Sequence, residues 1–96
     1  MDNSESMSTP AFLRAQPSHK GKRILGAFLR RRREAKGLTQ SDVARHMGRS
    51  KQWVVRSESG QREVSVAELL VFLKLYDSDP GDFLREVREA LPPPGA

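Results

Sequence analysis

One short polar segment carries side chains of the types that can hydrogen-bond to the edges of DNA bases. Lys51, Gln52 and Arg56 can pair with guanine or adenine in the major groove, and the apolar Val55 suits a thymine methyl group. At about 100° per residue along a helix, these four side chains lie within about 140° of one another, while Val54 points the other way. A helix over this segment would therefore present one face to DNA and the other to a core.

Groups suited to catalysis or metal binding are sparse in the sequence. The chain has no Cys, which excludes disulfides, thiolate zinc sites and cysteine nucleophiles. His19 and His46 lack the paired spacing of metal ligands. No Gly-x-Ser-x-Gly elbow, paired-carboxylate pocket or glycine-rich phosphate loop is visible. We therefore expect no enzyme activity, no cofactor and no metal.

Positive charge is concentrated in the middle of the chain. Residues 20–62 contain thirteen Lys or Arg against three acidic residues, a balance of +10, whereas residues 63–96 contain three against seven, a balance of −4. A basic block of this density is the usual footprint of a polyanion binder, because each phosphate that it neutralises releases condensed counterions. The length of 96 residues allows one domain, with 36% hydrophobic residues for a small core.

Apolar residues at helical spacing predict five short helices. The first begins at Ile24 and ends before Gly37, a residue suited to a left-handed helix stop. The other four are expected over residues 40–47, 51–59, 66–76 and 81–91. The β-branched residues occur singly or in pairs, and Asn-Gly and Asp-Gly turns are missing, so no strand is expected. The predicted fold class is all-α, a compact bundle of five helices.

Polar residues at the expected helix starts support these boundaries. The candidate N-caps are Thr39, Ser50, Ser65 and Asp79. Thr39 and Ser65 are each followed three residues later by an acidic residue, which is the spacing of a capping box. Asp79 is followed by a proline at the first helical position, where its missing N–H does no harm.

The two ends of the chain have a different composition. Residues 1–21 are rich in Ser, Thr, Pro and Gly and show no sustained period, so we expect a disordered tail there. Residues 92–96 begin with three prolines and form a second expected tail, which leaves residues 22–91 as the folded domain. No run of about 18 apolar residues and no signal-peptide pattern appears, so we expect no membrane contact and a cytoplasmic location at the nucleoid.

Three motifs stand at the offsets found in one family of DNA-binding domains. They are Gly37-Leu38-Thr39-Gln40, Ser50-Lys51-Gln52-Trp53-Val54 and Glu58-Ser59-Gly60-Gln61-Arg62. From Leu25 to about Val87, the chain resembles the helix-turn-helix domains of the XRE family, the Cro and phage-repressor type. The resemblance implies a lambda-repressor-like bundle that binds double-stranded DNA and inserts the helix over residues 51–59 into the major groove.

The resemblance also implies contacts with the DNA backbone and an internal ion pair. The residues at phosphate-contacting positions of the family are Thr39, Gln40, Arg49, Ser50, Ser59, Gln61 and Arg62. Such contacts fix the position of a protein on DNA without reading sequence. Arg33 and Glu58 match an Arg and a Glu that join two helices in many members of the family. A carboxylate near a helix C-terminus needs such a cation, because the helix dipole there is negative.

The chain departs from the family pattern at Arg49 and Ser57, where apolar residues are common. Trp53 precedes Ser57 by one helical turn, so we expect its ring to pack over the gap rather than to stack on DNA. Arg31 and Arg32 belong to a run of four arginines, and we assign them to solvation or to the general electrostatic field.

The helix expected over residues 66–76 is more apolar than one core-facing stripe requires, which implies a second buried surface. The expected dimer residues are Val71, Leu75, Leu84 and Leu91. A homodimer suits a family that reads two half-sites one DNA turn apart. We therefore predict a homodimeric, sequence-specific transcription regulator, acting as a repressor.

Two alternatives involve other partners. Domains of this fold also occur as antitoxins, so the main partner of the apolar surface can be a toxin-like protein instead of a second copy. RNA binding ranks lower, because interleaved surface aromatics that stack unpaired bases are missing.

Overall fold

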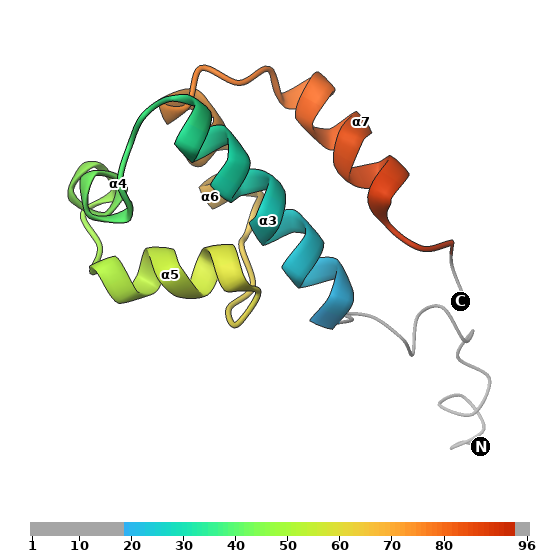
Figure 1. Ribbon diagram of the computed structural model, residues 1–96, viewed down its shortest axis with the longest axis horizontal. Helices are drawn as coiled ribbons and strands as arrows, with labels where there is room; N and C mark the ends of the chain where they lie inside the picture. The colour runs from blue at the N-terminus through green and yellow to red at the C-terminus, as the bar shows by residue number, and fades with distance from the viewer. Residues whose placement is uncertain (1–18, 94–96) are drawn as a thin grey trace.

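A computed structural model describes residues 19–93 of the chain, and over these residues it contains five α-helices and no strand (Figure 1). The helices are α3 (His19–Ala35), α4 (Gln40–Met47), α5 (Lys51–Ser59), α6 (Val66–Leu75) and α7 (Pro80–Ala90). The predicted all-α bundle is therefore confirmed.

The long helix α3 is the centre of the arrangement. It packs against α5, α6 and α7, while α4 packs against α5. In Figure 1, α5 and α7 lie on opposite sides of α3. All five helices or their caps contribute to the core, whose buried members are Leu29, Val43, Ala44, Val54, Leu69, Phe72, Leu73, Tyr76, Phe83 and Val87.

The helix starts follow the capping signals in the sequence. The hydroxyl of Thr39 accepts a hydrogen bond from the Asp42 N–H at 3.0 Å, and the Asp42 carboxylate accepts one from the Thr39 N–H at 2.9 Å. The bond from the Thr39 amide is the largest of several effects that lower the pKa of the Asp42 carboxyl. A second capping box starts α6 at Ser65, and Ser50 and Asp79 cap α5 and α7.

The predicted boundaries were wrong at the first helix. It begins at His19, so residues 19–21, assigned from the sequence to a tail, belong to α3. The prediction relied on apolar spacing, which starts only at Ile24, whereas Lys and Arg favour helix without giving an apolar signal. The ends of α6 and α7 differ from prediction by one residue. The remainder of the expected tails, residues 1–18 and 94–96, lies outside the described part of the chain.

Candidate nucleic-acid interface

A tight turn sets the direction of α5 relative to α4. Gly48 has a φ of 67°, in the left-handed region where a side chain would add strain. The N–H of Arg49 then donates to the carbonyl of Ala44 at 2.9 Å, which closes the end of α4. Only one residue later, the hydroxyl of Ser50 accepts from the Trp53 N–H at 3.1 Å and starts α5. The pair of helices is thus joined by a short, internally hydrogen-bonded turn.

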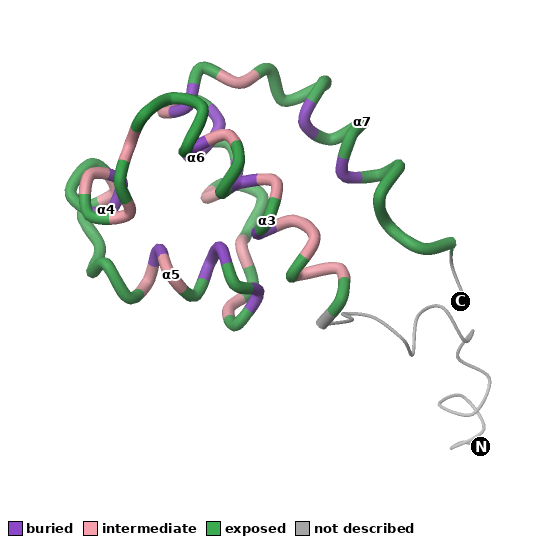
Figure 2. The backbone as a smooth tube through the Cα atoms, in the orientation of Figure 1, coloured by how far each residue is buried: buried purple, intermediate pink, exposed green. Residues whose placement is uncertain are grey.

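Helix α5 has an inner face and an outer face, as the alternation of buried and exposed segments in Figure 2 shows. Val54 is fully buried, and Val55 is half-buried. Lys51, Gln52 and Arg56 are exposed. Within residues 19–93 the side chains of these three residues form no hydrogen bond or ion pair, although the Ser59 hydroxyl donates to the backbone carbonyl of Arg56 at 3.4 Å. The polar candidates for base reading are therefore free to contact a ligand.

The end of α5 is held to α3 by the ion pair that the family resemblance implied. Arg33 Nε donates to Glu58 Oε2 at 2.6 Å, and Arg33 Nη2 donates to Glu58 Oε1 at 3.1 Å. The two side chains are only 9% and 4% exposed. Gln40 Nε2 donates to Glu58 Oε1 at 3.1 Å, and Arg33 Nη1 donates to the Leu38 carbonyl at 2.7 Å. The hydrogen bond with Glu58 raises the pKa of Arg33 further above its usual value.

Gly26 allows α5 to lie directly against α3. A Cβ atom at this position would stand 2.3 Å from the Glu58 carbonyl oxygen and 2.7 Å from the Ser57 carbonyl oxygen. Both atoms belong to backbone, so neither can rotate away. The sequence analysis missed this residue, because a single glycine within a helical pattern has several possible meanings.

The ring of Trp53 packs inside the domain, as predicted. It stacks on Phe72 with ring centroids 5.6 Å apart and an interplanar angle of 20°. The guanidinium of Arg62 lies 4.4 Å from the Trp53 centroid, and that of Arg49 lies 5.2 Å from it. The gap at Ser57 is closed differently from the prediction, because Arg62 Nη1 donates to the Ser57 hydroxyl at 3.1 Å.

Arg62 fixes the turn between α5 and α6. Its Nη2 donates to both carboxylate oxygens of Glu68 at 3.0 Å. Burial opposes ionisation of Glu68, but the Ser65 amide and the Arg62 guanidinium outweigh it and lower the pKa of this carboxyl. The sequence analysis missed this internal role, and a phosphate contact by Arg62 stays a prediction.

The other residues predicted to contact phosphates lie at the start of α4 and near the two ends of α5. The exposed ones are Thr39, Arg49, Ser50, Ser59 and Gln61. Gln40 is half-buried, with its amide bonded to Glu58. A shallow hollow beside the start of α4 is lined by Arg33, Glu34, Gly37, Leu38, Thr39, Gln40, Ser41 and Lys51. Lys51 of α5 and the N-terminal end of α4 thus share one concave surface.

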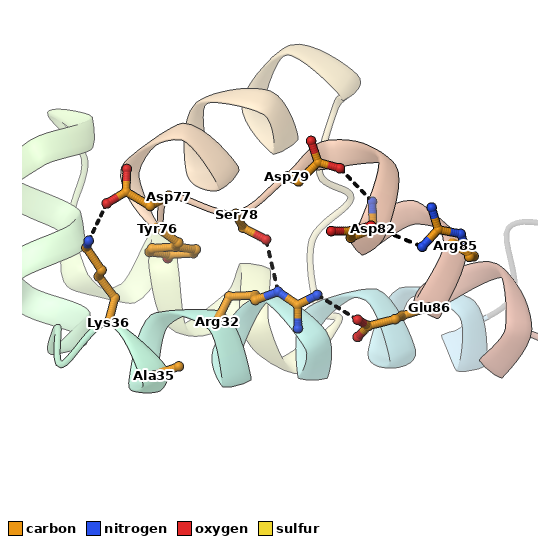
Figure 3. Close-up of a pocket in the computed structure, with 10 residues that line it drawn as sticks. All are labelled: Arg32, Ala35, Lys36, Tyr76, Asp77, Ser78, Asp79, Asp82, Arg85 and Glu86. Carbon is orange, nitrogen blue, oxygen red and sulfur yellow. Dashed lines mark hydrogen bonds and ion pairs between the residues drawn. The ribbon is translucent and has the colours of Figure 1, made fainter.

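On the side of α3 that faces away from α5, basic side chains of α3 pair with residues of the α6–α7 segment, as the close-up in Figure 3 shows. Arg32 donates to the Ser78 hydroxyl at 2.9 Å and pairs with Glu86 at 3.1 Å. Lys36 pairs with Asp77 where the chain leaves α6. The assignment of Arg32 to solvation was therefore wrong, because its partners come from the distant α6–α7 segment.

The predicted dimer residues divide into exposed and packed ones. Val71, Leu84 and Leu91 are exposed, at 51%, 48% and 38%. Leu75, which the sequence analysis assigned to the dimer surface, is half-buried and packs against the core, and its part in a dimer stays a prediction. The sequence analysis missed Val66 and Leu70 of α6, which are 73% and 46% exposed.

Comparisons with known proteins agree with this geometry. The family model described as "Helix-turn-helix domain" matches residues 24–85. The crystal structure of the clp gene regulator ClgR from C. glutamicum is similar, with a TM-score of 0.68 and 27% identity over 76% of this chain and 95% of that chain. The restriction-modification controller protein C.AhdI from Aeromonas hydrophila has a TM-score of 0.58 and 34% identity over 64% of this chain and 92% of that chain. No curated protein matches the chain.

The chain belongs to the helix-turn-helix domain family, with α4 and α5 as the helix pair. The resemblance to XRE-type regulators is confirmed. No helix in the described range 19–93 is long and apolar enough to cross a membrane.

Proposed function

We propose that this protein is a transcription regulator that binds duplex DNA and reads its sequence with α5. The observation that carries the proposal is the outer face of α5, where Lys51, Gln52 and Arg56 are exposed on a helix whose other face is fixed. A rigid helix with free polar side chains is what reading of base edges requires, because each hydrogen bond depends on position. The similar structures belong to a gene regulator and a restriction-modification controller protein.

The chemistry of each side chain suggests its contact. Lys51 and Arg56 suit the O6 and N7 acceptors of guanine, and Gln52 suits the N6 and N7 atoms of adenine. Val55 offers a methyl surface to thymine. The backbone contacts are assigned to the residues at the start of α4 and at the two ends of α5, with the phosphate nearest α4 in the hollow that Lys51 lines.

The active form in this proposal is a homodimer. The exposed apolar surface of α6, made of Val66, Leu70 and Val71, is the proposed seam. A two-fold dimer presents two copies of α5 to successive major grooves, so the DNA site is an inverted repeat whose half-sites lie about 10 base pairs apart. We further propose that the dimer represses a promoter that overlaps such a site.

Selection from a library of random duplexes tests the proposal. We expect enrichment of an inverted repeat and, on titration with salt, a loss of affinity by about 10³ to 10⁵ between 50 and 200 mM if the dimer neutralises roughly 6 to 10 phosphates. A reporter promoter carrying the enriched site should lose expression when the protein is produced. A library that stays random, or an affinity independent of salt, would contradict DNA binding.

A second candidate function follows from the same α6 surface. Its three exposed apolar residues also suit a different protein, as in an antitoxin that covers a toxin-like partner. The oligomeric state of the isolated protein separates the two candidates. A dimer at micromolar concentration supports self-association, whereas a monomer with enriched single half-sites supports a different partner.

A further inference from the structure

The basic block contains cations of two kinds, those with an internal acidic partner and those without one. Six of its thirteen Lys and Arg residues form ion pairs within the described chain, namely Arg30, Arg32, Arg33, Lys36, Arg45 and Arg62. Seven have no carboxylate partner among residues 19–93, namely Lys20, Lys22, Arg23, Arg31, Arg49, Lys51 and Arg56. Arg31 and Arg49 instead lie over aromatic rings.

Six of these seven cations gather in two places, while Arg31 lies on α3 over the ring of Phe28. One group, Arg49, Lys51 and Arg56, lies on and beside α5, on the proposed DNA-binding surface. The other group is the start of α3, where Lys20 and Arg23 are exposed and Lys22 is half-buried. The second group lies outside the helix pair, and the proposed function does not use it.

The start of α3 adjoins the C-terminal end of α5. A Cβ atom on Gly60, in the turn that follows α5, would stand 2.8 Å from the backbone nitrogen of Arg23 and 2.9 Å from its Cγ. The backbone and the side-chain stem of Arg23 therefore lie against this turn at Gly60. In Figure 1 the beginning of α3 comes down to the same edge of the molecule as the end of α5. The second group of cations thus lies beside the turn that follows α5.

Cations at the start of a helix oppose its dipole, so the helix dipole does not explain their presence. The first turns of α4, α6 and α7 each contain an acidic residue, whereas those of α3 and of the proposed reading helix α5 contain none. Lys20 and Lys22 instead place positive charge at the positive end of the helix. A local arrangement that weakens a helix is expected where binding requires it.

We propose that Lys20, Lys22 and Arg23 form a second contact with the DNA backbone, on phosphates outside the base pairs that α5 reads. The ligand is the sugar-phosphate backbone of duplex DNA, held by charge and without regard to sequence. This inference rests on the proposed function, because the position of the patch has meaning only if α5 enters the groove. It extends the binding surface beyond the helix-turn-helix pair to the start of the domain.

The test compares two double variants that remove equal charge. K20A/R23A removes two exposed cations from the proposed contact, and K74A/R88A removes two exposed cations from α6 and α7. Binding of a dye-labelled selected duplex and of a scrambled duplex is followed by fluorescence anisotropy over a series of salt concentrations. Melting temperatures from circular dichroism report whether each variant remains folded.

The wild type is expected to prefer the selected duplex. The slope of log affinity against log salt is negative, and for K20A/R23A we expect its magnitude to decrease by about 1 to 2 per domain. The affinity for the two duplexes should decrease by the same factor, because the contact does not read sequence. The melting temperature should not decrease, because the removed cations oppose the helix dipole. The control should keep the wild-type slope. A K20A/R23A slope equal to that of the wild type, or equal changes in the two variants, would overturn the inference and leave the proposed function standing. A wild type that binds neither duplex would instead overturn the proposed function, and this inference with it.

Discussion

Glu58 illustrates at the residue scale how one side chain joins several parts of the domain. Its carboxylate lies near the C-terminal end of α5, where the helix dipole is unfavourable to negative charge. Arg33 from α3 and Gln40 from α4 both donate to it, and the side chain is almost entirely shielded from water. The orientation of the proposed reading helix therefore depends on one buried anion with complementary donors.

Removing either member of this pair should destabilise the domain strongly. We expect Arg33→Met and Glu58→Gln to lower the free energy of unfolding by about 3 to 5 kcal/mol each, because each leaves a buried group without its partner. The double variant should lose much less than the two single losses combined, as measured by chemical denaturation. Additive losses below about 1 kcal/mol would show that the pair behaves like an exposed one.

Arg56 tests the reading face without disturbing the core. Arg56→Ala should weaken binding to the selected site by about 1 to 3 kcal/mol and relax the preference at one base pair, because its guanidinium suits guanine. Arg88→Ala on α7, which also removes one exposed cation, is the matched control and should leave the preference unchanged. Anisotropy titrations on the selected site and on its single-base variants measure both effects. An equal loss on all sequences would reassign Arg56 to the backbone.

The site could be predicted from the sequence where a residue acts alone or through a motif. The outer face of α5 follows from helical periodicity, and the Arg33–Glu58 pair follows from the family motif. The roles of Arg62 and Arg32 could not be predicted, because their partners depend on how α6 and α7 pack. From the sequence alone, several acidic residues are possible ion-pair partners for each arginine. Only the packing of the folded chain determines which of them is the partner.

At the scale of the elements, local signals determine the short helices better than the long one. The caps at Thr39, Ser50, Ser65 and Asp79 are all used as the sequence indicates, because capping is decided within about four residues. The start of α3 has no apolar periodicity and was placed too late. The close approach of α3 and α5 also lacks a local signal, since it depends on the absence of a side chain at Gly26.

Gly26→Ala should separate these two helices. The added methyl group would meet the Glu58 and Ser57 carbonyls, so we expect a loss of about 1 to 3 kcal/mol in the free energy of unfolding, despite the better helix propensity of alanine. Ala27→Ser adds one atom at the next, exposed position and should change stability much less. Denaturation curves of both variants provide the measurement. Equal stability of Gly26→Ala and the wild type would show that α5 does not need this contact.

At the scale of the whole molecule, the unpaired cations of the basic block and the large exposed apolar side chains are concentrated on different helices. Most of these cations lie along α5 and at the start of α3, while the large exposed apolar side chains lie on α6, on α7 and at the end of α7. A bound duplex and a second copy can therefore occupy the molecule together. The apolar surfaces of α6 and α7 still have to be distinguished, because either could form the seam of a two-fold dimer.

Leu70 and Leu84 offer a matched pair for that distinction, since they are 46% and 48% exposed and lie on α6 and α7 respectively. We expect Leu70→Glu to give monomers in sedimentation velocity at micromolar protein, while Leu84→Glu sediments with the wild-type dimer. Two-fold symmetry places each substitution in the seam twice. Burial of one leucine side chain contributes about 1.5 to 3 kcal/mol to the free energy of dimerisation. Loss of this contribution from both copies would raise the Kd for dimerisation by about 100-fold or more.

The opposite result, with Leu84→Glu monomeric and Leu70→Glu dimeric, would move the seam to α7. A wild type that is itself monomeric would leave both surfaces to another protein. Because each monomer retains its α5, Leu70→Glu should still bind a half-site weakly, but it should lose the preference for two half-sites about 10 base pairs apart. Retention of that spacing preference by a monomeric variant would show that DNA, and not the α6 surface, brings the two copies together.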